Sequence, residues 1–279
     1  MSRLRIAAIS FLNPAPLLWD FEHPPASQQL VQRYDVRYTL PSQCAAQLAS
    51  GEADLGLIPI AALATMPEVV AVPGCTIASL HAVRSIQLVL KPGLTMATVK
   101  TLATDAASRS SAAYVRTMMR EFYGDTPHVH EEEADLPAML RTSDAALLIG
   151  DPALLALEHR NDFADHTWID VASLWQHHTG LPWVAAVWAV RPEALTRCHI
   201  TREDLIADLT ASRDRGLTHI EDLVLEWTPR LPLSAETIRN YLTRNIHYTL
   251  DDQCLQAIDR FYTLAAQAEV LPAYKLRLL

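Results

Sequence analysis

The chain has 279 residues, 50% of them hydrophobic and 20% charged, and its formal net charge is −9. This length suggests one large domain or two of ordinary size, with enough apolar residues for a buried core. The eight glycines and seventeen scattered prolines exclude a collagen repeat and a glycine-rich or proline-rich linker. The negative charge disfavours binding to nucleic acid or to an anionic membrane, although a local basic pocket could hold a small anion.

The cysteines and the N-terminal segment predict a cytoplasmic protein. The four cysteines lie far apart without a C-x-x-C pair, which is typical of reduced, mostly structural residues. The first apolar run is broken by Asn13, Pro14 and Pro16, and no small-residue cleavage site follows it, so we expect no signal peptide. No stretch reaches the roughly 18 apolar residues of a membrane-spanning helix, so we expect no membrane partner.

The first part of the chain predicts alternating strands and helices. Apolar runs with β-branched residues predict strands over residues 4–9, 35–40, 53–58 and 85–90. Ser42 is expected to cap a helix over residues 43–49, which Gly51 ends.

A second series of elements begins near residue 100. Its pattern predicts strands over residues 102–104, 126–130, 145–149, 168–171 and 183–190, and helices over residues 110–122, 136–140 and 152–159. The last of these strands is apolar throughout, as in a central buried strand. From residue 201 we expect mostly helix, over residues 201–213, 234–245 and 251–268. The alternation favours an α/β fold with a largely parallel sheet.

The common catalytic signatures are mostly absent, among them the G-x-S-x-G elbow, the Walker loop and the H-E-x-x-H motif. His128 and His130 precede three glutamates and would face one side of a strand, so they could bind a metal, but a solvated strand end is the favoured interpretation. His177 and His178 precede a turn, and we interpret them as structural. We therefore assign no metal and no organic cofactor.

The segment after the strand over residues 102–104 predicts a loop rich in hydroxyl groups and then a helix start. Backbone N–H groups at a helix N-terminus are unpaired and carry partial positive charge, which favours binding of a carboxylate or phosphate. Ser108, Ser110 and Ser111 would add hydroxyl donors, and Arg109 would add a charge-assisted bond. Capping by one of these serines is the alternative, because it needs no ligand.

Two further strand ends place polar residues where open α/β sheets bind ligands. Asn13 follows the first strand and could bond a substrate hydroxyl or carboxylate, although an asparagine before proline is more often a turn former. Asp151 is expected to cap the next helix, with Pro152 at its first position, so a structural role is favoured over a catalytic one.

Five motifs occur in order along nearly the whole chain, most weakly after about residue 200. They are S-F-L-N-P-A-P (residues 10–16), P-S-Q-C-A-A-Q-L-A-S-G-E-A-D-L-G-L-I-P (41–59), D-A-A-S-R-S-S (105–111), A-L-L-I-G-D-P-A-L (146–154) and T-G-L-P-W-V-A-A-V-W-A (179–189). Each motif alone is unspecific. The ordered set closely resembles the chorismate dehydratases of the futalosine route of menaquinone biosynthesis.

The resemblance implies an α/β fold with two lobes, like that of type II periplasmic binding proteins, and a ligand cleft between the lobes. One lobe would comprise residues 1–91 plus 185–279, and the inserted lobe residues 92–184. We expect the lobes to close on the ligand, because an interlobe site with crossover hinges moves in that way.

The resemblance also implies the activity, which is the removal of water from chorismate to give 3-[(1-carboxyvinyl)oxy]benzoate, a carbon–oxygen lyase reaction. Asn13 and Ser85 would be the catalytic residues. Substrate-binding residues would be Ser10, Ser42, Ser108, Arg109, Ser110, Ser111, Asp151 and Thr179. Chorismate would be the partner, without nucleic acid, and the chain would be a monomer or homodimer. Ser110→Ala is then expected to lower catalytic efficiency by about 10- to 100-fold, and Ser110→Asp to be stable but nearly inactive.

Two alternatives stay open. A ligand-binding protein of the same fold would bind without chemistry, but the sequence shows neither an export signal nor a DNA-reading domain. The sibling enzyme that makes 1,4-dihydroxy-6-naphthoate typically carries S-P-C-P-N-D-T in its N-terminal loop, where this chain has S-F-L-N-P-A-P.

Overall fold

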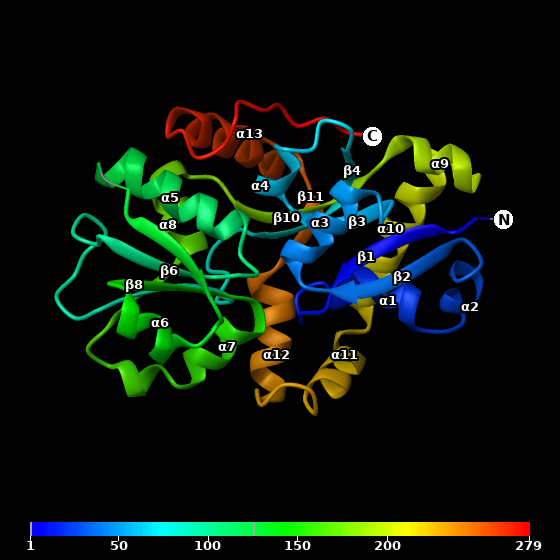
Figure 1. Ribbon diagram of the computed structural model, residues 1–279. Coiled ribbons are helices and arrows are strands. Elements are labelled where there is room, and N and C mark those ends of the chain that lie inside the picture. The colour runs from blue at the N-terminus through cyan, green and yellow to red at the C-terminus, as the bar shows by residue number, and fades with distance from the viewer. Residues whose placement is uncertain (1, 125) are drawn as a thin grey trace.

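The computed structural model describes residues 2–124 and 126–279, and over these residues it contains two β-sheets that lie side by side (Figure 1). The first sheet has the strand order β11-β4-β10-β3-β1-β2, and the second has the order β7-β6-β8-β5-β9. The strands of the first sheet are β1 (Leu4–Ile9), β2 (Tyr34–Thr39), β3 (Leu55–Pro59), β4 (Val70–Ser79), β10 (Trp183–Val190) and β11 (His247–Leu250). Those of the second are β5 (Ile86–Leu90), β6 (Thr101–Asp105), β7 (His128–Glu132), β8 (Ala145–Ile149) and β9 (Thr167–Asp170).

Helices pack against both sheets (Figure 1). They are α1 (Trp19–Glu22), α2 (Ala26–Leu30), α3 (Pro41–Ser50), α4 (Ile60–Leu63), α5 (Ser110–Tyr123), α6 (Leu136–Thr142), α7 (Gly150–Glu158), α8 (Val171–Thr179), α9 (Pro192–Cys198), α10 (Arg202–Thr218), α11 (Ile220–Trp227), α12 (Ala235–Asn240) and α13 (Asp252–Gln267). Helices α3, α9 and α10 contact the first sheet, and α6 and α7 contact the second. Helix α13 packs on both β10 and α5, so it connects the two parts. None of the helices in the described residues is long and apolar enough to cross a membrane.

The strand directions are mixed, so the prediction of a largely parallel sheet is wrong. In the first sheet β1 runs parallel to β2 and β3, whereas β10 runs antiparallel to β3 and β4. In the second sheet β6 is parallel to β7 and β8, and β5 is antiparallel to β8 and β9. The chain passes between the sheets twice, after β4 and before β10. The strand that follows each passage, β5 or β10, is antiparallel to both of its neighbours in the sheet that it enters.

Strand β5 belongs to the second sheet, although the predicted first lobe includes it. It pairs with β8 from Ile86↔Ile149 to Leu90↔Ala145, and with β9 on its other side. The apolar run of β5 suits either sheet, and only its distant partners decide between them. We therefore assign β5 to the inserted lobe. The other bounds of the two lobes stay a prediction.

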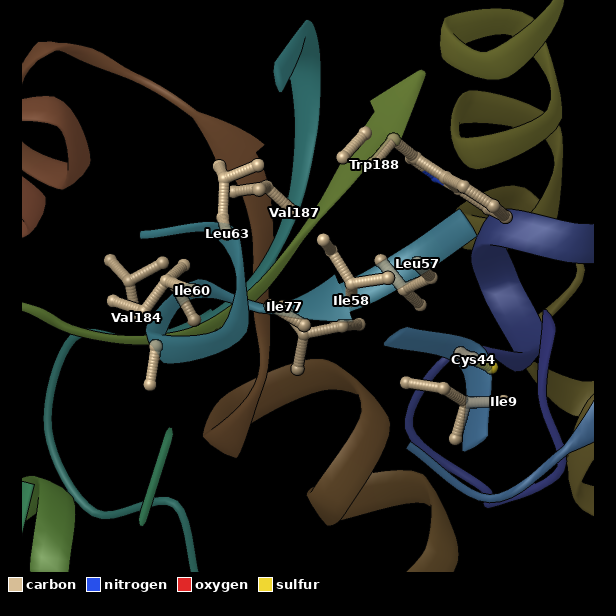
Figure 2. Close-up of a cluster of buried hydrophobic side chains, with 14 of the residues drawn as sticks. Ile9, Cys44, Leu57, Ile58, Ile60, Leu63, Ile77, Val184, Val187 and Trp188 are labelled. Atoms are coloured by element: carbon tan, nitrogen blue, oxygen red, sulfur yellow. The ribbon is translucent and has the colours of Figure 1, made fainter. Parts of the chain in front are cut away.

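The core of the first sheet shows why its strands are continuous apolar runs. Ile9, Leu57, Ile77 and Val187 are buried side chains of four neighbouring strands (Figure 2). Val187 pairs with Ile58 and Trp188 with Leu57, so these neighbours on β10 point to opposite faces and the core covers both sides of the sheet. Each such side chain contributes about 1.5–3 kcal/mol to stability when it is fully buried. Because β10 is central and buried on both faces, it tolerates no polar residue, which explains its sequence.

One buried carboxylate ties the first strand to the chain that returns from the second sheet. The Asp54 side chain is 1% exposed and forms ion pairs of 2.6 Å with both Arg5 and Arg197. Burial alone would raise the pKa of Asp54, but hydrogen bonds from the two arginines outweigh it and hold the pKa at about 2. The carboxylate therefore stays charged and fixes α9 beside β1.

Candidate active site

A small cavity of about 50 Å³, which we call the inter-sheet cavity, lies where the ends of β1, β8 and β10 meet the start of α5. Its walls include five predicted site residues from both sides: Asn13, Ser85, Arg109, Ser110 and Ser111. The structure thus brings together residues that are up to 98 positions apart in sequence, from Asn13 to Ser111.

The remaining predicted residues lie elsewhere. Ser42 and Ser108 line an adjacent open groove of about 720 Å³, which shares Arg109 with the cavity. Ser10 is exposed and its hydroxyl donates to the Thr39 carbonyl. Thr179 donates to the Trp175 carbonyl at the end of α8. Neither Ser10 nor Thr179 lines the cavity.

Helix α5 begins beside the cavity, but Ser108 and Ser110 at its start already have partners in the protein. Ser108 Oγ accepts a hydrogen bond from Ala112 N at 3.2 Å, which is part of the capping role considered above. Ser110 Oγ donates to the Ala185 carbonyl at 2.8 Å and accepts from Ala61 N at 3.2 Å. Ser110 therefore connects α5 to α4 and β10. Ser110→Asp would bury a carboxylate among these main-chain groups, so on this structure we expect that variant to be destabilised rather than stable.

Ser42 and Asp151 do not cap their helices as predicted. Helix α3 begins one residue earlier than Ser42, because Pro41 fits its first position, and no side chain caps it. Helix α7 has Ile149 as its N-cap, and Asp151 lies inside the first turn. The Asp151 carboxylate instead accepts a hydrogen bond from Leu12 N at 3.1 Å, across the gap between the two sheets.

Gly150 and Asp151 together hold the N-terminal loop against the second sheet, and we call these contacts the Leu12–Asp151 clasp. Gly150 has φ +62°, and a Cβ atom there would lie 2.5 Å from the Phe11 ring. Only glycine therefore combines this backbone conformation with so close an approach. Burial raises the pKa of Asp151 to about 6, although the bond from Leu12 lowers it.

Several buried polar atoms at and behind the cavity have no hydrogen-bond partner among the described residues. Asn13 Oδ1 and Trp183 Nε1 belong to residues of the cavity wall, and the Tyr241 hydroxyl is a third. More than nine in ten buried polar groups in proteins are paired, so such atoms need an explanation. A polar ligand in the cavity would supply partners for the first two.

Trp183 and Tyr241 are the site residues that the sequence analysis missed. Trp183 starts an apolar run and Tyr241 lies within a predicted helix, so both have the pattern of ordinary core residues. Their only distinguishing signal is a polar atom on a fully buried ring, which sequence alone does not reveal.

The histidines do not converge on the cavity. His130 Nε2 lies 2.7 Å from Glu132 Oε1 on β7, and His177 and His178 lie at the end of α8 rather than on a strand. Among the described residues, the one His/Cys/carboxylate group close enough to share an ion is His247, Asp251 and Cys254. Asp251 already bonds His247 and caps α13 through Cys254 N, so its position has a structural explanation.

Comparisons with known proteins agree with this geometry. The fold matches protein AF1704 from Archaeoglobus fulgidus, with a TM-score of 0.75, 13% identity and coverage of 96% of this chain and 97% of that one. It also matches a Candida albicans protein with the generic periplasmic binding protein fold, with a TM-score of 0.64, 14% identity and coverage of 99% and 92%. The chain therefore has the α/β fold of the periplasmic binding proteins.

The sequence comparisons place the chain more narrowly. A chorismate dehydratase from Thermus thermophilus is 27% identical over 235 residues, which are 80% of this chain and 83% of that protein. The profile of a family described as menaquinone biosynthesis matches residues 4–267, nearly the whole chain. The chain therefore belongs to the menaquinone biosynthesis family and is an enzyme of that pathway.

Proposed function

We propose that the enzyme is a hydro-lyase that removes water from chorismate to give 3-[(1-carboxyvinyl)oxy]benzoate. The similarity to the Thermus thermophilus chorismate dehydratase supports this substrate. The observation that carries the proposal is the inter-sheet cavity, in which unpartnered atoms of Asn13 and Trp183 accompany Ser85, Arg109 and Ser111. Such a set of amide, indole, hydroxyl and guanidinium groups suits a small dianion that also carries a hydroxyl.

The proposed reaction makes few demands on the protein. The C4 hydroxyl and the C3 proton of chorismate leave as water, and the ring becomes aromatic, so the driving force lies in the substrate. The enzyme has to hold the dianion, stabilise charge on the ring carboxylate and exclude bulk water. We propose that Arg109 and Ser111 bind a carboxylate, and that Asn13 and Ser85 contact the reacting part of the ring. The enolpyruvyl carboxylate of the substrate itself is the proposed proton acceptor.

The cavity has to open before substrate can enter. Sites for ligands of ordinary size have volumes of about 300 Å³ or more, whereas the inter-sheet cavity holds about 50 Å³. We propose that breaking the Leu12–Asp151 clasp lets the two sheets separate. Small-angle scattering should then show a larger radius of gyration for free enzyme than for enzyme saturated with product, and equal radii would contradict this opening.

The decisive experiment is incubation with chorismate alone, followed by mass spectrometry and ultraviolet spectroscopy. The proposal predicts loss of one water and a benzoate-like spectrum. Binding of chorismate without loss of water would instead support a ligand-binding protein of the same fold, and formation of a naphthoate from another precursor would support the sibling enzyme.

Variants test the assignment of residues. Asn13→Ala and Ser85→Ala should each lower kcat/KM by about 10- to 100-fold, the effect of losing about 1.4–2.8 kcal/mol of transition-state binding. Ser10→Ala is the matched control, because Ser10 lies in the same loop as Asn13 but is exposed and bonded to Thr39. Equal activity of Asn13→Ala and Ser10→Ala would remove Asn13 from the site.

The predictions on partners and cofactors remain proposals. We propose chorismate as the ligand, a monomer or homodimer in the cytoplasm, and turnover without a metal or organic cofactor. Sedimentation and cell fractionation test the assembly and the location. Exhaustive chelation should leave chorismate consumption intact, and activity that disappeared and returned with zinc would contradict the proposal.

A further inference from the structure

A π-helical turn lies directly behind the inter-sheet cavity. Helix α12, which lies between the two sheets (Figure 1), ends at Asn240 and continues as a π-helix over Tyr241–Asn245. Asn245 Nδ2 donates to the Ala82 carbonyl at 2.8 Å, in the connection by which β4 leads into β5. The turn is therefore fixed to the first passage between the sheets, three residues before Ser85. Short π-helical segments occur frequently at functional sites.

Tyr241, the first residue of this turn, carries an unpartnered hydroxyl beside the proposed catalytic pair. The residue is 1% exposed, and its hydroxyl lies within interaction range of the Ser85 and Asn13 side chains. It nevertheless forms no hydrogen bond of regular geometry with the described residues, and neither does Asn13 Oδ1. Hydrogen bonds from Ser85 and Asn13 would lower the pKa of the phenol, so both side chains face its oxygen as donors. The Asn13 NH2 group therefore lies toward Tyr241, while Asn13 Oδ1 stays without a partner.

The protonation state of Tyr241 favours this pairing. Burial raises the pKa of the phenol well above its ordinary value, which the neighbouring Ser85 and Asn13 only partly offset. The hydroxyl therefore keeps its proton at neutral pH, where it acts as a neutral donor or acceptor.

We propose that Tyr241 is a positioning residue whose phenol oxygen accepts a hydrogen bond from the Asn13 NH2 group and thereby directs Asn13 Oδ1 toward the substrate. An amide held at its NH2 group presents its oxygen in one orientation, whereas a free amide can rotate by half a turn. The same hydroxyl limits the positions open to the Ser85 side chain. This inference rests on the proposed function, because it assumes that Asn13 contacts the substrate.

The kinetic test compares Tyr241→Phe with Tyr248→Phe. Tyr248 is a matched control, because it lies on β11, is 3% exposed and also carries an unpartnered hydroxyl. Tyr241→Phe should lower kcat for chorismate about 10-fold, with KM changed less than about twofold, whereas Tyr248→Phe should change neither. Equal kinetics of the two variants would overturn the proposal.

A spectroscopic test does not depend on turnover. The sequence contains only four asparagines, so enzyme labelled with [15N]asparagine gives four side-chain amide signals, and Asn13→Ala identifies the one of interest. Tyr241→Phe should shift the Asn13 amide signal, and Tyr248→Phe should not. An unmoved signal would refute the positioning role. If wild-type enzyme failed to consume chorismate, the proposed function would fail, while the amide signal would still decide the role of Tyr241.

Discussion

The partly buried carboxylate of Asp151 destabilises the folded enzyme at neutral pH, and this effect can be measured. Its pKa is raised by burial from an ordinary value of 3.8 to about 6, and its carboxylate accepts a hydrogen bond from Leu12 N. Between pH 4 and 6 the folded chain therefore keeps a proton that the unfolded chain has lost. Stability contributed by this group falls as pH rises through that window and is constant above it. At about 1.36 kcal/mol per pKa unit, the cost above pH 6 is at most about 3 kcal/mol.

Asp151→Asn should remove this cost and keep an oxygen for Leu12 N. We expect the variant to be more stable than wild type by about 1–3 kcal/mol at pH 8, and the difference to shrink by about 2 kcal/mol at pH 4, where Asp151 is neutral in the folded enzyme. Urea unfolding at the two pH values measures both quantities. A variant that is equally stable at pH 8, or less stable, would refute the reasoning.

Asp144→Asn is the control with the opposite sign. Hydrogen bonds from Lys100 N and Thr101 N stabilise the Asp144 carboxylate, and the first of these is the main cause of its lowered pKa. Asp144→Asn removes this stabilised charge and should therefore lower the free energy of unfolding at pH 8. Chorismate turnover by Asp151→Asn gives a second result. If the Asp151 carboxylate only forms the clasp, the kcat of this variant should stay within a few-fold of wild type.

Three further predictions test other parts of the structure. Ser110→Ala should lower the free energy of unfolding by about 1–3 kcal/mol, because two buried main-chain groups lose their partner, and unchanged urea unfolding would contradict the hydrogen bonds described. Gly150→Ala should destabilise by about 2–3 kcal/mol and lower turnover by displacing Phe11, whereas Gly93→Ala, with φ +77° and no atom within 4 Å, should lose only about 1 kcal/mol. Asp54→Asn should lower the free energy of unfolding by about 2 kcal/mol at pH 7. Wild type should lose the same amount between pH 4 and 2, because Asp54 becomes protonated there, and an acid titration followed by circular dichroism measures this loss.

The sequence predicts elements well where burial is uniform. Strands β8 and β10 agree with their predicted bounds to the residue, because each is an unbroken apolar run that the chain can bury on both faces. Strand β4 was missed because Pro73 and Gly74 lie in its middle, and these residues ordinarily mark a turn. In the structure Gly74 adopts φ +97°, and the pairing of β4 with β11 shifts its register nearby, so the strand bends there without ending.

The site could be predicted only in part, for a different reason. The family resemblance assigned Asn13, Ser85 and the start of α5 to the site, and the structure brings all three to one cavity. Asn13 follows a strand of the first sheet, whereas Ser85 and α5 adjoin strands of the second. The contact of Phe11 with Gly150 and the placement of Tyr241 depend on how two separate sheets meet. No local pattern encodes that arrangement, so these contacts appear only in the folded chain.

The last residues of the chain protect an edge of the first sheet. Strand β11 pairs with β4 only from Gly74 to Ala78, which leaves the beginning of β4 without this neighbour. The C-terminal segment takes its place: Ala71 N donates to the Arg277 carbonyl, and Leu279 N donates to the Ala71 carbonyl. An uncovered strand edge offers its N–H and C=O groups to another molecule. A fusion or truncation that lifts residues 277–279 from β4 would therefore promote edge-to-edge aggregation, at residues that do not line the inter-sheet cavity.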